Sequence, residues 1–315
     1  MLKKRPSRLI CFLLLLCFII SAIPCYNTDA ASKPPSFNAA LTDDNMMKLL
    51  KAYDSDAYYF VSRTRKKGST FGTWMAGSEN LAEAATVTVH EEFHKYTHTF
   101  YKFDWDTGFS DKYYLGKKKN IYVSETNLFK TETVTKNLPK QYRTFRYDTY
   151  VSKGSSVSAN QNGVYGLLNE FSAYYWGMHV DYALYPYYDV NVKSGAGWHH
   201  FENSYINNRD AYAEFYYWTL VYLEFARVKK PKVYKDIMNN KNYIITFDKM
   251  QKAYVSLMKK YEKKLDIVNN KYYGHNFNKN QSYGGYRVLM SQINSKKYKK
   301  VREAIKTKAK KYKKQ

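Results

Sequence analysis

The order of apolar and polar residues predicts a chain built mostly of helices. Apolar side chains return every three or four residues over long stretches, which is the period that lines one face of a helix. Met250, Tyr254, Leu257 and Tyr261 fall on one such face. We predict long helices over 78–99, 164–182, 208–228 and 247–267, and shorter ones after Thr42 and over 286–293 and 298–309.

Stretches rich in tyrosine, threonine and valine favour strands in the first half of the chain. We predict strands over 58–62 and 70–75 around a basic turn, and two or three exposed strands within 112–152. Loops are expected over 155–163 and 186–198, where glycine, serine, asparagine and proline gather. Strands followed by helices in this order predict the α+β class.

The first thirty residues have the three-part layout of a secretory signal peptide. Basic residues precede an apolar run from Leu9 to Ile23, and small residues fit cleavage after Ala30. The run is shorter than the roughly 20 residues that cross a bilayer, although an uncleaved anchor stays open. We therefore predict a signal peptide over 1–30 and a secreted, extracellular protein that is a monomer.

Composition narrows the class of partner. The 315 residues include 51 Lys and Arg against 27 Asp and Glu, for a formal net charge of +24. The hydrophobic share of 44% excludes a wholly disordered chain. All three cysteines, Cys11, Cys17 and Cys25, lie in the predicted leader, so no disulfide is expected afterwards. The lysine-rich composition and the leader suggest a Gram-positive bacterium, where anionic cell-wall polymers are expected partners and nucleic acid is not.

One motif carries metal chemistry. His90-Glu91-Glu92-Phe93-His94 lies within the predicted helix 78–99 and matches H-E-x-x-H. Residues four apart stack on one helix face, so His90 and His94 can bind one Zn²⁺. Glu91 can then take a proton from a water whose pKa the zinc lowers, which makes it the predicted general base. The alternative is an exposed helix with two incidental histidines.

A catalytic zinc site usually has three protein ligands, so a third is needed. Glu170, in the predicted helix 164–182, is our candidate, because a second helix antiparallel to the first would bring its carboxylate to the metal. The alternative is that Glu170 caps or solvates its own helix. His179, Glu214 and Glu224 are rivals, and His98 is expected to lie outside the ligand set or on the surface.

The H-E-E-F-H motif, followed by a helix with Asn169-Glu170-x-x-Ala173, resembles the gluzincin group of zinc metallopeptidases. The resemblance implies a zincin-like fold, with a small strand-containing N-terminal lobe that carries the active-site helix and a mainly helical C-terminal lobe. It implies His90, His94 and Glu170 as zinc ligands and Glu91 as the base. It also implies a strand at the cleft that pairs with an extended peptide, which would lie at 71–76.

Two features depart from that group. Glu170 lies 76 positions after His94, whereas thermolysin-like members have a few tens at most. Those members also carry an acid four residues after the glutamate, where this chain has Tyr174. The group that orients the histidines is therefore left unassigned by the resemblance.

A peptidase also needs a donor that stabilises the transition state. His200 and Tyr205, which follow a glycine-rich stretch expected to be a flexible loop, are the candidates. The alternative is that they are ordinary loop residues.

The C-terminal segment 296–315 holds 11 Lys and Arg and one Glu. We divide the mature chain into a catalytic domain over 31–295 and this basic helix or tail. The segment is either a solvated terminal helix or an attachment to teichoic acids or anionic lipid headgroups.

These observations predict a secreted zinc-dependent peptidase, of the endopeptidase kind, that acts on peptide or protein substrates. One alternative is a non-catalytic cell-envelope binding protein that uses its basic surface. Another is a zinc amidase or peptidase that cuts the peptides of peptidoglycan.

Overall fold

The computed structural model describes residues 33–105 and 108–314. The predicted signal peptide over 1–30 lies outside the described residues. Pro34–Gln315 forms one compact unit. In the described part of the chain, no helix is both long enough and apolar enough to cross a membrane.

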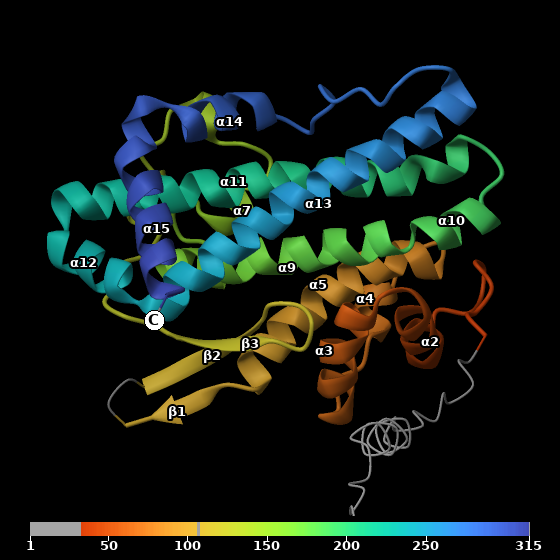
Figure 1. The fold of residues 1–315 in the computed structure, drawn as a ribbon, viewed down its shortest axis with the longest axis horizontal. Coiled ribbons are helices and arrows are strands. Elements are labelled where there is room, and N and C mark those ends of the chain that lie inside the picture. The colour runs from red at the N-terminus through yellow and green to blue at the C-terminus, as the bar shows by residue number, and fades with distance from the viewer. Residues whose placement is uncertain (1–32, 106–107, 315) are drawn as a thin grey trace, which may run out of the picture. The chain divides into compact units, whose positions relative to one another are not determined.

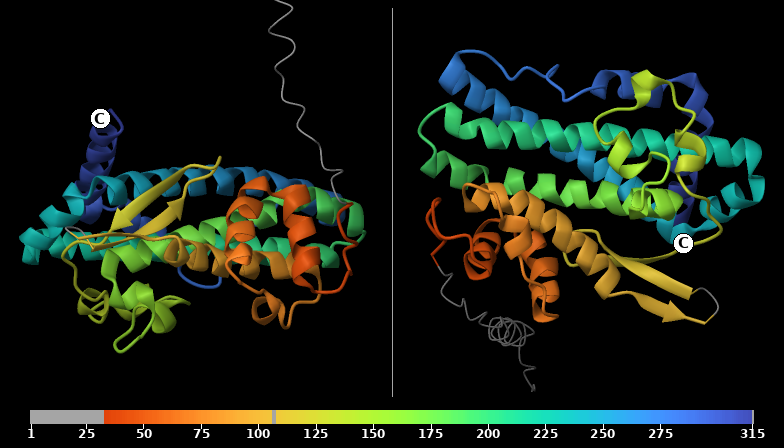
Figure 2. Two further views of the ribbon diagram at one scale, coloured as in Figure 1. Left: turned by 90° about the horizontal axis from the view of Figure 1, so that it is seen from below. Right: turned by 180° about the vertical axis from the view of Figure 1, so that it is seen from behind.

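Three long helices run side by side through this unit (Figure 1). They are α9 (Gly163–Ala183), α11 (His199–Lys229) and α13 (Lys241–Tyr273). A fourth, α5 (Leu81–Thr99), packs against α9 on the side away from α11 (Figure 2). The shorter α2 (Asp43–Tyr53), α3 (Ser55–Lys66) and α4 (Gly72–Met75) pack around α5. The site described below lies where α5 meets α9.

One small antiparallel sheet follows α5, with strand order β1-β2-β3. Its strands are β1 (Lys102–Asp104), β2 (Gly108–Tyr114) and β3 (Asn120–Ser124). Phe103 pairs with Phe109, and Tyr113 pairs with Ile121. The side chain of Asn242 on α13 donates to the Tyr122 carbonyl over 2.7 Å, which ties β3 to the helical body.

Short helices connect these elements. Between β3 and α9 lie α6 (Glu132–Thr135), η2 (Lys140–Tyr142), α7 (Tyr147–Tyr150) and α8 (Ser158–Gln161). The remaining ones are α10 (Tyr185–Asn191), η3 (Ala196–Trp198), α12 (Pro231–Asn239), α14 (Tyr286–Asn294), η4 (Lys296–Tyr298) and α15 (Lys299–Tyr312).

Local sequence sets the start of α5. The Asn80 side chain accepts a hydrogen bond from the Glu83 backbone N–H over 3.0 Å, and the Glu83 carboxylate accepts one from the Glu79 N–H over 2.7 Å. These contacts satisfy donors that a helix N-terminus leaves open. These contacts fix where α5 starts, and the start of the helix determines which face carries the H-E-x-x-H motif.

Small residues allow α5 and α9 to approach closely. Gly177 faces Thr86 across the interface, and a Cβ at Gly177 would lie 3.2 Å from the Thr86 carbonyl oxygen. Ala173, one turn earlier on the same helix, is fully buried. Because a larger side chain at Gly177 would push the helices apart, this glycine helps to set the distance between the two halves of the site.

Aromatic side chains fill the core between the long helices. Phe171 on α9 packs against Tyr212 of α11 and against Phe247 and Tyr254 of α13, with ring centroids 5.2–5.7 Å apart. Burying a side chain of this size contributes about 1.5–3 kcal/mol. The tyrosine richness of the chain is thus largely a property of its core.

The α+β class is confirmed, as are the four long helices. The strands predicted at 58–62 and 70–75 are wrong, because 58–62 lies in α3 and 72–75 forms α4. The Asp54 carboxylate accepts the Asp56 and Ala57 N–H groups and starts α3, so capping and packing override β propensity there. The strand expected at 71–76 is also wrong, because Gly72–Met75 forms α4.

Other predicted elements also differ from the structure in their boundaries. Within 112–152 the structure has strands only as far as Ser124, and the rest forms short helices joined by turns and loops. The predicted loops contain α8, α10 and η3, and α11 begins at His199, earlier than expected. Gly195 and Gly197 were expected to be flexible. They are packing positions instead, since a Cβ at Gly197 would lie 2.4 Å from Val192.

Candidate metal centre

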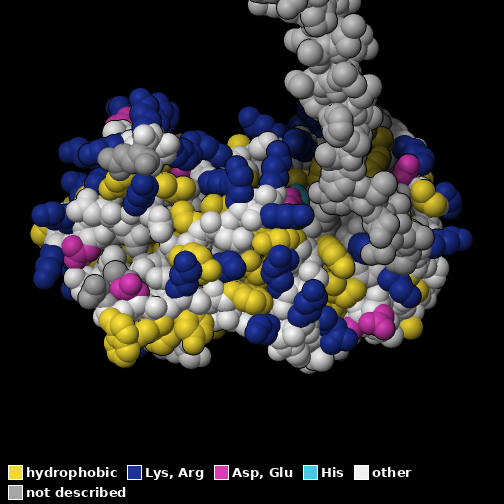
Figure 3. Space-filling model, turned by 60° about the horizontal axis from the view of Figure 1, so that its bottom comes forward, with side chains coloured by type: hydrophobic (Ala, Val, Ile, Leu, Met, Phe, Trp, Pro, Cys, Tyr) yellow, Lys and Arg dark blue, Asp and Glu magenta, His cyan; other side chains and the backbone are white. Residues whose placement is uncertain are grey.

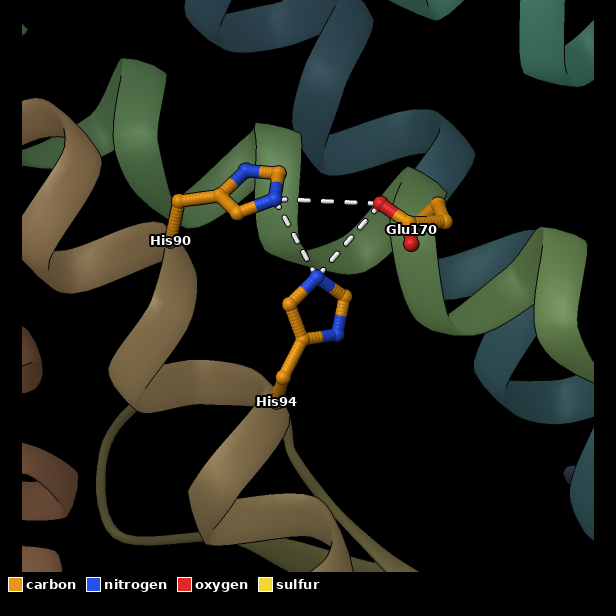
Figure 4. Close-up of side chains that lie close together, drawn as sticks. All are labelled: His90, His94 and Glu170. Carbon is orange, nitrogen blue, oxygen red and sulfur yellow. Dashed lines mark hydrogen bonds and ion pairs between the residues drawn. The ribbon is translucent and has the colours of Figure 1, made fainter. Parts of the chain in front are cut away.

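His90, His94 and Glu170 converge where α5 meets α9 (Figure 4). The two Nε2 atoms of the histidines lie 3.1 Å apart. The Oε2 atom of Glu170 lies 3.4 Å from Nε2 of His94 and 3.7 Å from Nε2 of His90. The three predicted ligands are therefore brought together in a nearly regular triangle of atoms.

This triangle fits a metal ion. Ligand atoms bound tetrahedrally at about 2.0–2.2 Å lie roughly 3.3–3.6 Å from one another, close to the separations found here. Among the described residues, Oε2 of Glu170 is buried and has no hydrogen-bond donor. A buried carboxylate oxygen left in this way is unfavourable unless a cation compensates it. The group His90-His94-Glu170 can therefore hold a metal ion.

Asn169 orients one of the histidines. Its Oδ1 atom bonds to Nδ1 of His94, and its side chain is almost fully buried. An amide oxygen only accepts, so Nδ1 carries the proton and the lone pair of Nε2 points into the triangle. This is the usual way in which a neighbour prepares a histidine for metal binding.

The surroundings shift the pKa values of the two histidines in opposite directions. Burial lowers the pKa of His90 well below its ordinary value, with His94 and Arg146 acting in the same direction. Burial also lowers the pKa of His94, but the Glu170 carboxylate and the bond to Asn169 outweigh it and raise that pKa overall. The lowered pKa favours the neutral form of His90, which is the form that binds a metal, whereas the raised pKa favours the protonated form of His94.

The two glutamates inside the motif differ in their surroundings. Glu91 lines a cavity of about 180 Å³ together with His90, and burial raises the pKa of its carboxyl group. Glu92 is fully buried on the other side of the helix. It accepts hydrogen bonds from Thr64 and from Ser69, the latter over 2.6 Å, and so fastens α5 to α3 and the segment after it.

A chain of polar groups ends at the same cavity. Buried Arg146 pairs with Glu214 over 2.7 Å and donates from Nε to the Tyr174 hydroxyl over 3.0 Å. The Tyr174 hydroxyl lies 3.0 Å from that of Tyr150. Either tyrosine can donate in this contact, so the Tyr150 proton is available to the cavity only when Tyr174 is the donor.

Both tyrosines lie beside the triangle of His90, His94 and Glu170. Tyr150 and Tyr174 line the cavity with His90 and Glu91. The Tyr174 ring meets the His90 ring edge-on, with centroids 4.5 Å apart. Burial and the Glu170 carboxylate raise the pKa of Tyr150, which keeps its hydroxyl protonated and able to donate.

His200 and Tyr205 make other contacts. Both lie in α11, not in a loop. The Tyr205 hydroxyl donates to Glu262 over 2.6 Å, and Nδ1 of His200 lies 3.9 Å from a Glu83 oxygen. Neither is among the described residues that line the cavity beside His90.

The rival ligands also lie elsewhere. His179 pairs with Asp54 over 2.7 Å, and the other rivals, Glu214 and Glu224, pair with Arg146 and Arg227. The His98 side chain is half exposed beside Asp111, in line with the expectation that it stays outside the ligand set.

Sequence reasoning missed Tyr150, Arg146 and the function of Asn169. Asn169 had a usable signal, because it precedes the candidate ligand Glu170 in the helix. Tyr150 and Arg146 lay in a region expected to form exposed strands. No local pattern connects Arg146 with Glu214, which lies 68 positions later.

Comparison with known proteins gave no match. No family model matches the chain, and no curated protein or solved structure is significantly similar to it.

Proposed function

We propose that this protein is a zinc-dependent hydrolase of peptide bonds with a zincin-like active site. The observation that carries the proposal is the triangle of His90, His94 and Glu170, with Glu91 on the adjoining cavity wall. Two imidazoles and one carboxylate favour Zn²⁺ over Mg²⁺ or Ca²⁺, which prefer oxygen ligands.

The residues around the triangle have complementary tasks in this proposal. Zn²⁺, when bound, would lower the pKa of a water toward neutrality and polarise the substrate carbonyl. Glu91 accepts the proton of the attacking water and passes it to the leaving amine. The Tyr150 hydroxyl donates a hydrogen bond to the carbonyl oxygen as negative charge develops on it.

The leader-like N-terminus places the substrate outside the cytoplasm in this proposal. Proteins and the peptides of peptidoglycan both offer amide bonds there. The cavity beside the triangle is small, at about 180 Å³, so one side chain at a time would occupy it.

The test measures metal and hydrolysis together. We expect close to one zinc per chain, and cleavage of a peptide library or of muropeptides that a chelator abolishes and zinc restores. Glu91→Gln should keep the zinc but lose activity by about 10²–10⁴-fold, because the base is gone while the ligands remain.

His98→Gln is the matched control, since His98 lies on the same helix but outside the triangle. It should keep both zinc and activity. A protein that takes up no zinc would contradict the proposal, and full activity in Glu91→Gln would contradict the base assignment. The substrate that is cleaved, peptide or muropeptide, decides between the two substrate classes.

A further inference from the structure

The basic C-terminal helix is folded onto the body of the protein. α15 packs against α13, and its apolar stripe of Val301, Ile305 and Ala309 is buried there. Most of its lysines remain on the outside, and Figure 3 shows Lys and Arg side chains crowded at this end of the molecule. The apolar stripe is therefore already used in packing and is not available to enter a bilayer.

A basic groove lies between α13 and α15. It has a volume of about 430 Å³, and Phe247 and Tyr216 form part of its wall. Its lining includes four cations and two acids: Lys252, Lys299, Arg302, Lys306, Asp248 and Glu303. We call these residues the α13–α15 groove. Its lining carries an excess of positive charge in a concave surface.

The acids of the groove are already compensated. The Asp248 carboxylate lies 2.8 Å from Lys252 and 2.7 Å from Lys313, a further lysine of the C-terminal segment. Glu303 lies 3.8 Å from Lys299, and both are more than 60% exposed. Such an exposed pair contributes little, so Lys299 can exchange this partner for an anionic ligand.

One cation of the groove is held in place. The guanidinium of Arg302 donates to the carbonyl oxygens of Ser295, over 3.1 Å, and of Ile293 and Asn294 at the end of α14. Its charge therefore stays in the groove wall.

We propose that the α13–α15 groove binds a linear, phosphate-rich polymer, as found in bacterial cell walls. The concave, cationic lining fits a chain of repeated phosphate charges. The buried apolar stripe disfavours a lipid surface, because nothing on α15 is left to insert. This proposal does not depend on the metal centre.

The test uses the intact protein with poly(glycerol phosphate) and inorganic polyphosphate as probes, in a titration repeated at several salt concentrations. We expect binding that weakens steeply with salt, as contacts between cations and phosphates do. The double variant Lys299→Gln/Lys306→Gln should bind about tenfold more weakly, with a shallower dependence on salt. Circular dichroism would confirm that the variant is folded.

Lys140→Gln/Lys153→Gln is the matched control, because both lysines are exposed and lie outside the groove. It removes the same charge and should bind within about twofold of the wild type. Equal weakening in both variants would overturn the proposal and indicate attraction by net charge alone. Tighter binding to vesicles of anionic phospholipid, or to single-stranded DNA, than to the phosphate polymers would also overturn it.

Discussion

Helix α9 meets the N-terminal helices through two clusters of histidine and carboxylate, and the two clusters differ in what they leave open. At the first, Glu170 faces His90 and His94 of α5, and one buried carboxylate oxygen has no donor among the described residues. At the second, His179 bonds to one oxygen of Asp54 over 2.7 Å. The other Asp54 oxygen accepts two backbone N–H groups at the start of α3.

The difference distinguishes a group that can hold a metal ion from a contact that is complete without one. Each cluster pairs histidine with a buried acid, and each takes one of its residues from α9. In the second, every carboxylate oxygen has a donor, so the cluster is complete without an ion. In the first, three ligand atoms converge, and a cation would compensate the carboxylate oxygen that has no donor. Changes at the first cluster should therefore alter chemistry, and changes at the second should alter stability.

The largest effect expected is on kcat, and it concerns a tyrosine beside the first cluster. Tyr150 lines the cavity and its hydroxyl can donate there when Tyr174 donates to it, whereas the Tyr205 hydroxyl is engaged by Glu262. Tyr150→Phe should lower kcat by about 10²–10³-fold through loss of a donor to the developing negative charge. Zinc content should be unchanged, since no ligand is removed. Steady-state kinetics and metal analysis on the same sample check this.

Tyr205→Phe is the control for that variant. It should leave kcat unchanged while lowering stability, because Glu262 loses its donor. A Tyr150→Phe enzyme with normal kcat would remove Tyr150 from the mechanism. A large loss of kcat in Tyr205→Phe alone would move the donor to the residue expected from sequence.

A smaller effect is expected at Asn169. Asn169→Ala removes the acceptor that fixes the proton of His94 on Nδ1, so the competing tautomer becomes populated. We expect the affinity for zinc to fall by about 10–100-fold, measured by competition with a chromophoric chelator. Asn169→Asp keeps an acceptor at this position and should restore most of the affinity. Equal loss in both variants would contradict an orienting role.

The sequence could predict the part of the site that depends on the spacing of residues close together in the chain. His90 and His94 share a helix face by their separation of four, and Asn80 and Glu83 mark where that helix starts. The need for a third ligand on a neighbouring helix predicted Glu170. Periodicity predicted the long helices, and the order of strands before helices predicted the α+β class.

The rest depended on contacts between distant segments. Residues 58–62 have strand-like composition, yet Asp54 starts a helix there and α5 buries its apolar face. Tyr150 reaches the cavity only because Tyr174 and the Arg146–Glu214 pair hold it. These partners lie far apart along the chain, and no single-sequence pattern relates them.

The smallest effect expected lies at the second cluster and depends on pH. Burial lowers the pKa of His179, but Asp54 and then Asp56 outweigh it and raise the pKa overall, against a smaller opposing effect of Lys260. A raised folded-state pKa means that the pair stabilises the fold fully below the unfolded value of about 6.5. This contribution is lost as the pH rises through the folded-state pKa. His179→Gln should therefore cost about 1–2 kcal/mol at pH 6 and less at alkaline pH.

Urea unfolding of the wild type and His179→Gln across this pH range measures the difference. His98→Gln serves as the control, because the His98 side chain is half exposed and its contact with Asp111 is 3.3 Å long. That variant should change the free energy of unfolding by less than about 0.5 kcal/mol at any pH. Zinc content should stay normal in both variants. A loss of zinc in His179→Gln would show that the two clusters of α9 are coupled and would break the comparison, whereas a pH-independent cost would show that His179 acts by packing alone.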